Sequence, residues 1–113
     1  MIGLLRGRVV DRTRRGEVLV DVGGVGYRAS VTPRTLAALG TPGSEVVLHT
    51  HLHVREDALV LFGFPTAEER ECFEALIGAR GVGPALALAI LSVHSPSQLA
   101  RALAEGDVDA LTL

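Results

Sequence analysis

Hydrophobic and polar residues alternate along the first 64 residues of the chain in the two-residue rhythm of β-strands. The clearest run covers residues 17–22, where three valines share one face and two acidic residues share the other. A Gly23-Gly24 pair connects this run to residues 25–31, and two glycines in that position favour a two-residue hairpin turn. The pattern therefore predicts antiparallel strands joined by a tight turn.

The same alternation predicts further strands over residues 2–10, 45–54 and 58–64. A short helix is expected between the third and fourth strands, with Thr32 as its N-cap, Pro33 in its first turn and Gly40 as its terminator. Five strands with a short helix in that place are the layout of an OB barrel. We therefore predict that residues 1–64 form an all-β OB barrel of five strands plus a short helix.

The last strand of this barrel, residues 58–64, is apolar in both of its alternating sets. A strand with two apolar faces in a small barrel needs cover on its outer side as well. We therefore expect the helical part of the chain or another subunit to pack against it.

The periodicity becomes helical from residue 65 onward, which predicts a small all-α domain over residues 65–113. Thr66 and Glu69 have the spacing of a capping box at the start of its first helix. Ser95 and Gln98 repeat this spacing ahead of a third helix.

A glycine-rich turn, Gly81-Val82-Gly83-Pro84, separates the first two predicted helices. The first N–H groups of a helix have no partner inside the helix and carry partial positive charge, so they accept a phosphate without a cationic side chain. Glycines also allow a polymer backbone to come close. The turn therefore predicts a helix-hairpin-helix that binds nucleic-acid phosphates irrespective of base sequence, with an ordinary tight turn as the alternative.

The composition of the 113-residue chain is that of a folded protein, with 48% apolar residues and a mean hydropathy of +0.36. No segment offers the run of about 20 apolar residues that spans a bilayer. The single cysteine, Cys72, cannot form an internal disulfide and is interpreted as a packing residue. We therefore expect a cytoplasmic protein with no membrane association.

The net charge of −2 is unevenly divided along the chain. Residues 1–55 contain eight arginines and four acids, which gives +4, whereas residues 56–113 contain three arginines and nine acids, which gives −6. The basic first half is compatible with a nucleic-acid partner. The candidates for cationic surface are Arg6, Arg8, Arg12, Arg14, Arg15 and Arg55.

An acidic pair, Glu56-Asp57, occupies the predicted turn between the last two strands. Such a turn is commonly just solvated. The functional alternative is that two adjacent carboxylates presented to DNA repel its phosphates and so hold two strands or two duplexes apart.

Three histidines, His49, His51 and His53, share one face of the fourth predicted strand. Residues two apart on a strand are separated by about 6.5–7 Å, which makes ligation of one ion by all three awkward. We therefore interpret them as structural or interfacial and expect no metal site. A metal-dependent hydrolase built on them is retained as a distant alternative.

The chain offers no catalytic constellation and no cofactor motif. It lacks a serine–histidine–aspartate arrangement with a nucleophile elbow, and a Walker loop is impossible because the chain contains no lysine. We therefore expect a non-enzymatic protein without a cofactor.

Five segments of the chain occur in a recognisable order: Met1-Ile-Gly3 with Arg6-Gly7, residues 22–27 (Val-Gly-Gly-Val-Gly-Tyr), residues 51–58 (His-Leu-His-Val-Arg-Glu-Asp-Ala), residues 61–64 (Leu-Phe-Gly-Phe) and residues 81–92, which begin Gly-Val-Gly-Pro. Together they resemble the RuvA family, the Holliday-junction-binding subunits of the bacterial branch migration machinery. The resemblance extends over the whole chain.

The resemblance implies a homotetramer, or an octamer of two such plates, that holds an open four-way DNA junction. It implies that Glu56 and Asp57 form an acidic pin at the centre of the assembly. It also implies that Gly81, Val82 and Gly83 bind a phosphate of a duplex arm, with Arg80 beside them. In the full-length family members the partners are the ATP-driven motor RuvB and the resolvase RuvC.

Two features of the chain depart from the family pattern. The position after Pro84 is commonly basic in the family and is Ala85 here. The chain also ends at Leu113, where the resemblance places the start of a second hairpin, so we expect residues 65–113 to hold the first hairpin only. An oligomeric assembly fragment that has lost DNA binding and motor coupling is therefore the alternative function.

Overall fold

The computed structural model describes residues 1–13, 15–95, 97–99 and 101. The chain divides into two compact units, of which the first covers Met1–Thr66 and the second begins at Ala67. Among the residues described, no helix is long and apolar enough to cross a membrane.

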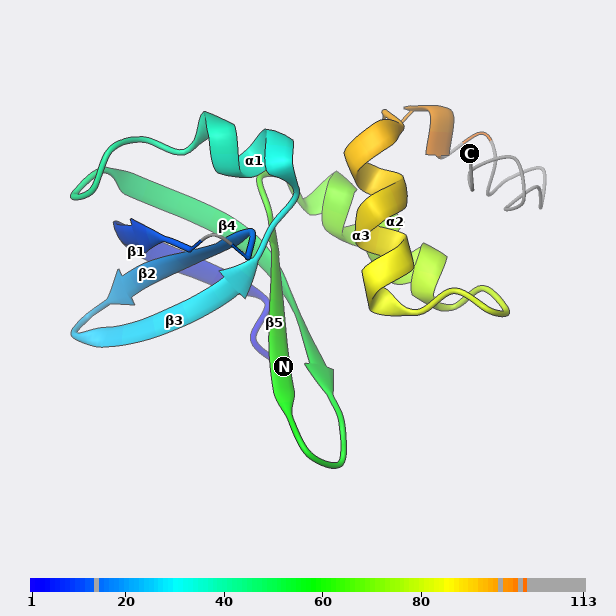
Figure 1. Cartoon of the computed structure of the whole chain (residues 1–113), viewed down its shortest axis with the longest axis horizontal. Helices are drawn as coiled ribbons and strands as arrows, with labels where there is room; N and C mark the ends of the chain where they lie inside the picture. The colour runs from blue at the N-terminus through cyan, green and yellow to red at the C-terminus, as the bar shows by residue number, and fades with distance from the viewer. Residues whose placement is uncertain (14, 96, 100, 102–113) are drawn as a thin grey trace. The chain divides into compact units, whose positions relative to one another are not determined.

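The first unit is a closed five-stranded barrel with the strand order β1-β2-β3-β5-β4 (Figure 1). Its strands are β1 (Leu4–Arg12), β2 (Glu17–Val22), β3 (Val25–Ser30), β4 (Glu45–Val54) and β5 (Leu59–Phe64). All neighbouring strands are antiparallel except β3 and β5, which run parallel and pair only through Ala29↔Leu61 and Ser30↔Phe62. The predicted OB barrel is therefore confirmed, and β2 and β4 have the predicted bounds.

The barrel interior is filled by the alternating aliphatic residues that the strand pattern predicted. Val18 and Val20 of β2 are fully buried, and Leu48 of β4 is 1% exposed. Their cluster continues through other buried residues, which are Leu5, Val9, Ala29, Val31 and Leu61. Both alternating sets of β5 include buried side chains, because Leu61 of one set and Phe62 and Phe64 of the other are buried.

The first strand differs from its predicted bounds of residues 2–10. It begins at Leu4 and continues to Arg12, and its register against β2 shifts between Val9 and Asp11. A bulge of this kind adds one residue to a strand and breaks the strict alternation, so the period alone placed the end of the strand too early.

The short helix α1 (Pro33–Ala38) lies between β3 and β4, as predicted. The Thr32 side chain caps it by accepting a hydrogen bond from the Thr35 N–H at 3.2 Å. The predicted role of Gly40 was wrong, because the helix ends through Leu39 in an extended conformation and Gly40 has no positive φ. The Arg12 guanidinium satisfies the free carbonyls there, since it donates to the oxygens of both Leu39 and Gly40.

The second unit contains the helices α2 (Ala67–Ile77) and α3 (Pro84–Val93). Phe73 and Leu76 of α2 and Ala87 of α3 are almost inaccessible to solvent. The second predicted capping box is confirmed, because the Ser95 N–H donates to Gln98 Oε1 at 3.0 Å and the Gln98 N–H donates to Ser95 Oγ at 3.3 Å.

Candidate nucleic-acid interface

The turn between α2 and α3 is held by its own backbone hydrogen bonds. The Gly78 N–H donates to the Glu74 carbonyl at 3.3 Å and the Ala79 N–H donates to the Leu76 carbonyl at 3.0 Å, which ends α2. Gly81 then takes a φ of +79°, a conformation that side-chain-bearing residues avoid. The chain reverses at Gly81 and enters α3 at Pro84.

Val82 anchors this turn from the inside. Its side chain is 9% exposed, and its N–H donates to the Ala79 carbonyl at 3.2 Å. The Val82 amide therefore already has an acceptor within the turn. Packing accounts for a valine between the two glycines, and the predicted contact of Val82 with a phosphate stays a prediction.

The open donors lie on either side of Val82. Gly83 is the N-cap of α3 without a side-chain hydrogen bond, and Pro84 in the first turn has no N–H. In the described part of the chain, no acceptor is recorded for the N–H groups of Gly81, Gly83, Ala85 and Leu86. The positive end of the α3 dipole lies at the same place. The first N–H groups of a helix have no acceptor inside it, and Pro84 has no N–H, so the open donors continue to Ala85 and Leu86. The sequence prediction did not name these two residues.

Gly83 differs from Gly81 in what requires it. Its φ of −91° is accessible to any residue, and a Cβ built on it meets nothing within 4 Å. The fold therefore does not need a glycine at this position. The missing side chain matters only to a molecule that approaches from outside.

The acidic pair lies at the tip of the hairpin formed by β4 and β5, which projects from the barrel (Figure 1). The ladder continues to the pair Val54↔Leu59, and the Arg55 N–H donates to the Ala58 carbonyl at 2.8 Å. Glu56 and Asp57 form the two-residue connection beyond that bond, and both are exposed. A continuous strand pair thus presents two carboxylates to solvent at its far end.

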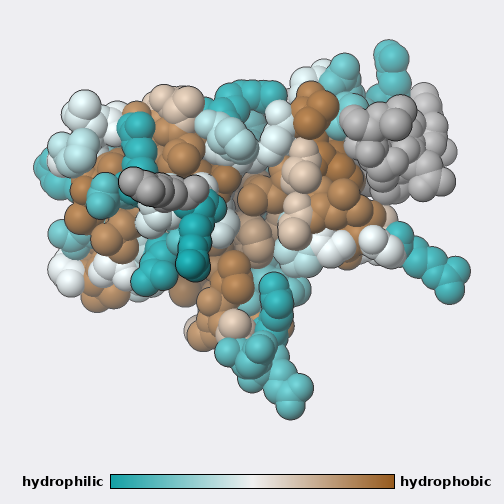
Figure 2. All heavy atoms as spheres, in the orientation of Figure 1, coloured by the Kyte–Doolittle hydropathy of each residue, from teal (hydrophilic) through white to brown (hydrophobic). Residues whose placement is uncertain are grey.

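Apolar side chains lie directly behind these carboxylates. Val54 is 66% exposed and Leu59 is 70% exposed, and they face each other as partners in the ladder. Figure 2 shows the mixture on the projecting end of the hairpin, with brown apolar atoms beside teal hydrophilic ones. The hairpin is therefore a charged tip on an apolar stem.

The candidate arginines differ in whether their side chains are bound within the barrel unit. Arg8 donates to the Gly43 carbonyl at 3.0 Å and lies 3.8 Å from the Glu45 carboxylate, and Arg12 is bound at the end of α1. Arg6, Arg15 and Arg55 are exposed, and in the part of the chain that the structure describes their side chains have no recorded ion pair. Arg14 lies outside the described residues.

The three histidines of β4 lie on one face, as predicted, opposite Phe64, Phe62 and Val60 of β5. The rings of His51 and His53 are 6.5 Å apart between their centroids. Among the described residues, no group of three or more histidine, cysteine or acidic side chains is arranged to hold a metal ion. The metal-dependent hydrolase therefore has no support in this geometry.

A five-stranded OB barrel followed by a helix-hairpin-helix turn with open backbone donors defines a class of nucleic-acid-binding architecture. The family comparison agrees for both parts of the chain. Residues 1–63 match the RuvA N terminal domain, and residues 73–113 match the SAM-like helix-hairpin-helix tandem. The chain belongs to the RuvA family.

Curated relatives are similar over nearly the whole chain. A protein of Rubrobacter xylanophilus named Holliday junction branch migration complex subunit RuvA is 55% identical over 108 residues, which are 96% of this chain and 55% of that protein. A protein of the same name from Thermobifida fusca is 54% identical over 112 residues, which are 99% of this chain and 54% of that protein. The chain therefore spans about half the length of the curated relatives that it matches.

The expectation that residues 65–113 hold only the first hairpin stays a prediction. The matching helix-hairpin-helix description is that of a tandem, and it continues to residue 113. Residues 102–113 lie outside the described part of the chain.

Proposed function

We propose that this chain binds four-way DNA junctions by their shape and holds them open for branch migration by a separate ATP-driven motor. The observation that carries the proposal is the turn at Gly81 and Gly83 at the start of α3, where a Cβ on either glycine would meet nothing within 4 Å and no acceptor is recorded for either N–H among the described residues. Phosphates are the same on every sequence, so such a turn binds duplex arms without base readout. The names of the curated relatives agree with this activity.

The acidic tip supports recognition of a junction over a plain duplex. Glu56 and Asp57 repel the phosphates of a continuous duplex, but at the centre of an open junction the arms leave a gap that can hold them. We therefore propose that they act as the acidic pin. This role requires several tips to meet at one axis, and so it requires a homotetramer, or an octamer of two tetramers.

We propose that the chain is non-enzymatic and cytoplasmic and that it binds no cofactor. Its partners are junction DNA, copies of itself and, through segments of a longer chain, the RuvB motor and the RuvC resolvase. The second candidate function is an assembly fragment that forms the same oligomer but binds DNA weakly. It is favoured by Ala85, which leaves Arg80 as the cation next to the turn where the family commonly has a second basic residue after Pro84.

A titration that compares a four-way junction with a linear duplex of the same arm sequences distinguishes the two candidates. We expect the junction to bind more tightly, and native mass spectrometry of the complex to show four or eight chains per junction. Oligomers that bind both DNAs equally weakly would support the assembly fragment. A monomer that binds the two DNAs equally would contradict both.

A further inference from the structure

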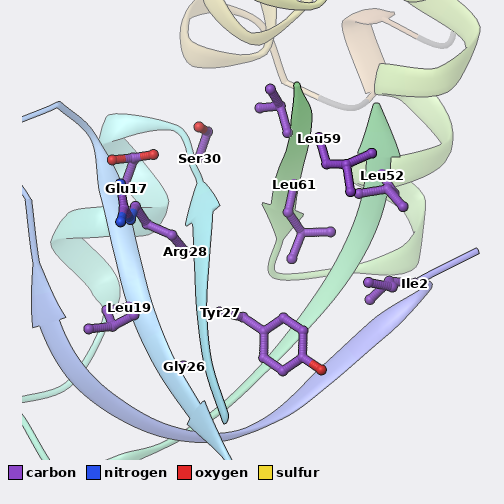
Figure 3. Close-up of a pocket in the computed structure, with 11 residues that line it drawn as sticks. Ile2, Glu17, Leu19, Gly26, Tyr27, Arg28, Ser30, Leu52, Leu59 and Leu61 are labelled. Carbon is purple, nitrogen blue, oxygen red and sulfur yellow. The ribbon is translucent and has the colours of Figure 1, made fainter. Parts of the chain in front are cut away.

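The barrel unit contains a cleft of about 470 Å³ that the acidic tip and the glycine turn leave unused. It lies where β3 and β5 separate, because these strands pair only at Ala29↔Leu61 and Ser30↔Phe62. Before those pairs, the facing edges of the two strands diverge, and the cleft opens between them (Figure 3). Its volume is in the range of about 300–1,000 Å³ that is usual for ligand sites.

The walls of the cleft combine aliphatic side chains with one aromatic ring. The aliphatic wall is lined by Ile2, Leu52, Leu59 and Leu61. The Tyr27 ring points from β3 into the gap toward them (Figure 3). The polar groups of the lining, Glu17, Arg28 and Ser30, come from β2 and β3 on the other side.

The Tyr27 ring is held in a position where a nucleobase can stack on it. It is half-buried and packs against the aliphatic cluster of the barrel interior, which holds the ring in place. Another part of the ring faces the cleft. Nucleobases of any sequence stack on an aromatic ring that is fixed in this way.

Arg28 supplies a cation at the rim. It is exposed, and within the described residues it forms no recorded ion pair. The acid of the lining, Glu17, accepts a hydrogen bond from the Thr13 hydroxyl at 3.4 Å. Figure 3 shows the Arg28 side chain pointing away from the Tyr27 ring, toward Glu17 of β2, so a base on the ring and a phosphate on the guanidinium belong to different nucleotides of one strand.

We propose that this cleft binds single-stranded DNA, with an unpaired base stacked on Tyr27 and a phosphate further along the same strand on Arg28. The strands that line it, β2, β3 and the β4–β5 hairpin, form the face on which OB folds bind oligonucleotides. All residues that line this site belong to the barrel unit, whereas the turn at Gly81 and Gly83 belongs to the helical unit. The site goes beyond the proposed function, because duplex arms held by their phosphates leave no base free to enter an apolar cleft.

The chain provides its own reporter for this contact. Tyr27 is the only tyrosine and the chain has no tryptophan, so tyrosine emission reports the cleft alone. Titration with an oligothymidylate of about 12 nucleotides, a length within the usual site size of an OB fold, should quench this emission to saturation. The affinity should fall as salt is raised, because a phosphate bound to Arg28 releases counterions.

Substitutions separate stacking from a structural effect. Tyr27→Leu keeps an apolar side chain but removes the ring, and it should weaken binding of a fluorescein-labelled oligothymidylate about tenfold by anisotropy. Tyr27→Phe keeps the ring and should bind within about twofold of the unmodified chain. Arg28→Gln should weaken binding and its salt dependence. Val25→Ala is the matched control, since Val25 is exposed on the same strand but does not line the cleft.

Three results would overturn the proposal: no quenching, equal binding by the Leu and Phe variants of Tyr27, or Tyr27 emission that changes with protein concentration alone. The last result would mean that a second copy of the chain covers the cleft. The junction titration is independent, because Tyr27→Leu should still bind a junction through the turn. Gly83→Ala should in turn still bind the oligothymidylate.

Discussion

At the scale of single residues, the two glycines of the α2–α3 turn serve different purposes. Gly81 is required by its φ of +79°, whereas Gly83 has an ordinary backbone conformation and open space around it. One glycine therefore shapes the turn, and the other leaves room for a ligand. Sequence alone treats them as equivalent members of one motif.

Substituting each glycine by alanine should separate these purposes. Gly81→Ala should destabilise the helical unit by about 1–2 kcal/mol, because a Cβ is strained in the left-handed region. Gly83→Ala should cost less than about 1 kcal/mol, the range for an unfavourable N-cap residue. It should nevertheless weaken junction binding about tenfold, since it separates a phosphate from charge-assisted donors.

Thermal unfolding and junction titration of the two variants check this prediction. Gly78→Ala is a suitable control, because Gly78 lies outside the open donors and has no positive φ. If Gly83→Ala binds junctions as well as the unmodified chain does, the donors around Gly83 do not contact phosphate.

Cys72 is a residue whose environment suppresses its chemistry. Burial raises the pKa of its thiol, and the carboxylates of Glu68, Glu69 and Glu71 raise it further. A higher pKa means less thiolate at a given pH, so at pH 8 the native chain should react slowly with a thiol-specific reagent. Unfolding in guanidinium removes both causes and should speed the reaction.

The same shift has a consequence for stability. Because the thiol pKa is higher in the folded state, the unfolded state loses its proton first as the pH rises. The contribution of Cys72 to the free energy of unfolding should therefore fall as the pH rises above the ordinary thiol pKa. Cys72→Ala should be less sensitive to pH in that alkaline range, and a native thiol that reacts as fast as the unfolded one would contradict this account.

At the scale of elements, the β4–β5 hairpin both closes the barrel and holds the acidic pair. Its base closes the barrel through Leu48 and Leu61, which are buried, while its end holds two exposed carboxylates. A continuous ladder links the two regions. The hairpin therefore connects its charged tip to the barrel core through paired strands.

Neutralising the tip should change discrimination among DNA shapes. Glu56→Gln with Asp57→Asn should strengthen duplex binding by removing repulsion, and so reduce the preference for a junction by roughly tenfold. The control is Glu68→Gln with Glu71→Gln, which removes the same charge from exposed positions on α2. The measurement is the ratio of junction to duplex affinity at fixed salt, and an unchanged ratio in the tip variant would refute the acidic pin.

At the scale of the whole molecule, the positive charge of the sequence and the proposed phosphate-binding turn lie in different units. The barrel unit has eight arginines and six acids, whereas residues 67–113 have three arginines and seven acids. The unit that bears the glycine turn is therefore acidic. If that turn binds phosphate, it does so through local backbone donors with the exposed Arg80 as the adjacent cation, and any further cationic contribution comes from the barrel.

This division predicts which arginine governs the salt dependence of junction binding. Arg55 is exposed beside the acidic tip, whereas Arg12 is bound to the carbonyls that end α1. Arg55→Gln should reduce the slope of log affinity against log salt by about 0.9 for each phosphate that the arginine neutralises. Arg12→Gln should leave the slope unchanged and lower the melting temperature instead.

Titrations at several salt concentrations, with a melting curve for each variant, test this assignment. The assignment fails if Arg12→Gln changes the slope or if Arg55→Gln does not. Native mass spectrometry of both variants shows whether assembly is intact, and so keeps dissociation of the oligomer from being taken for weaker phosphate binding.

The features predictable from sequence depend on residues that are close together in the chain. The alternation of residues 17–22 and 45–54 determined two strands to the residue, and the Ser95–Gln98 spacing determined a capping box. The glycine turn was placed correctly because glycine and proline restrict the backbone locally. Short-range sterics and periodicity are present in the sequence itself.

The remaining features were decided only by the tertiary structure, because they arise between residues that are distant in sequence. Arg12 donates to the Gly40 carbonyl just after α1, from 28 positions earlier in the chain. This contact, which only the fold creates, replaces the terminating role that the sequence pattern gave to Gly40. The strands β3 and β5 pair at only two positions, and the cleft between them is lined by both Tyr27 and Leu61. No local pattern encodes such a meeting; it follows from how the barrel closes.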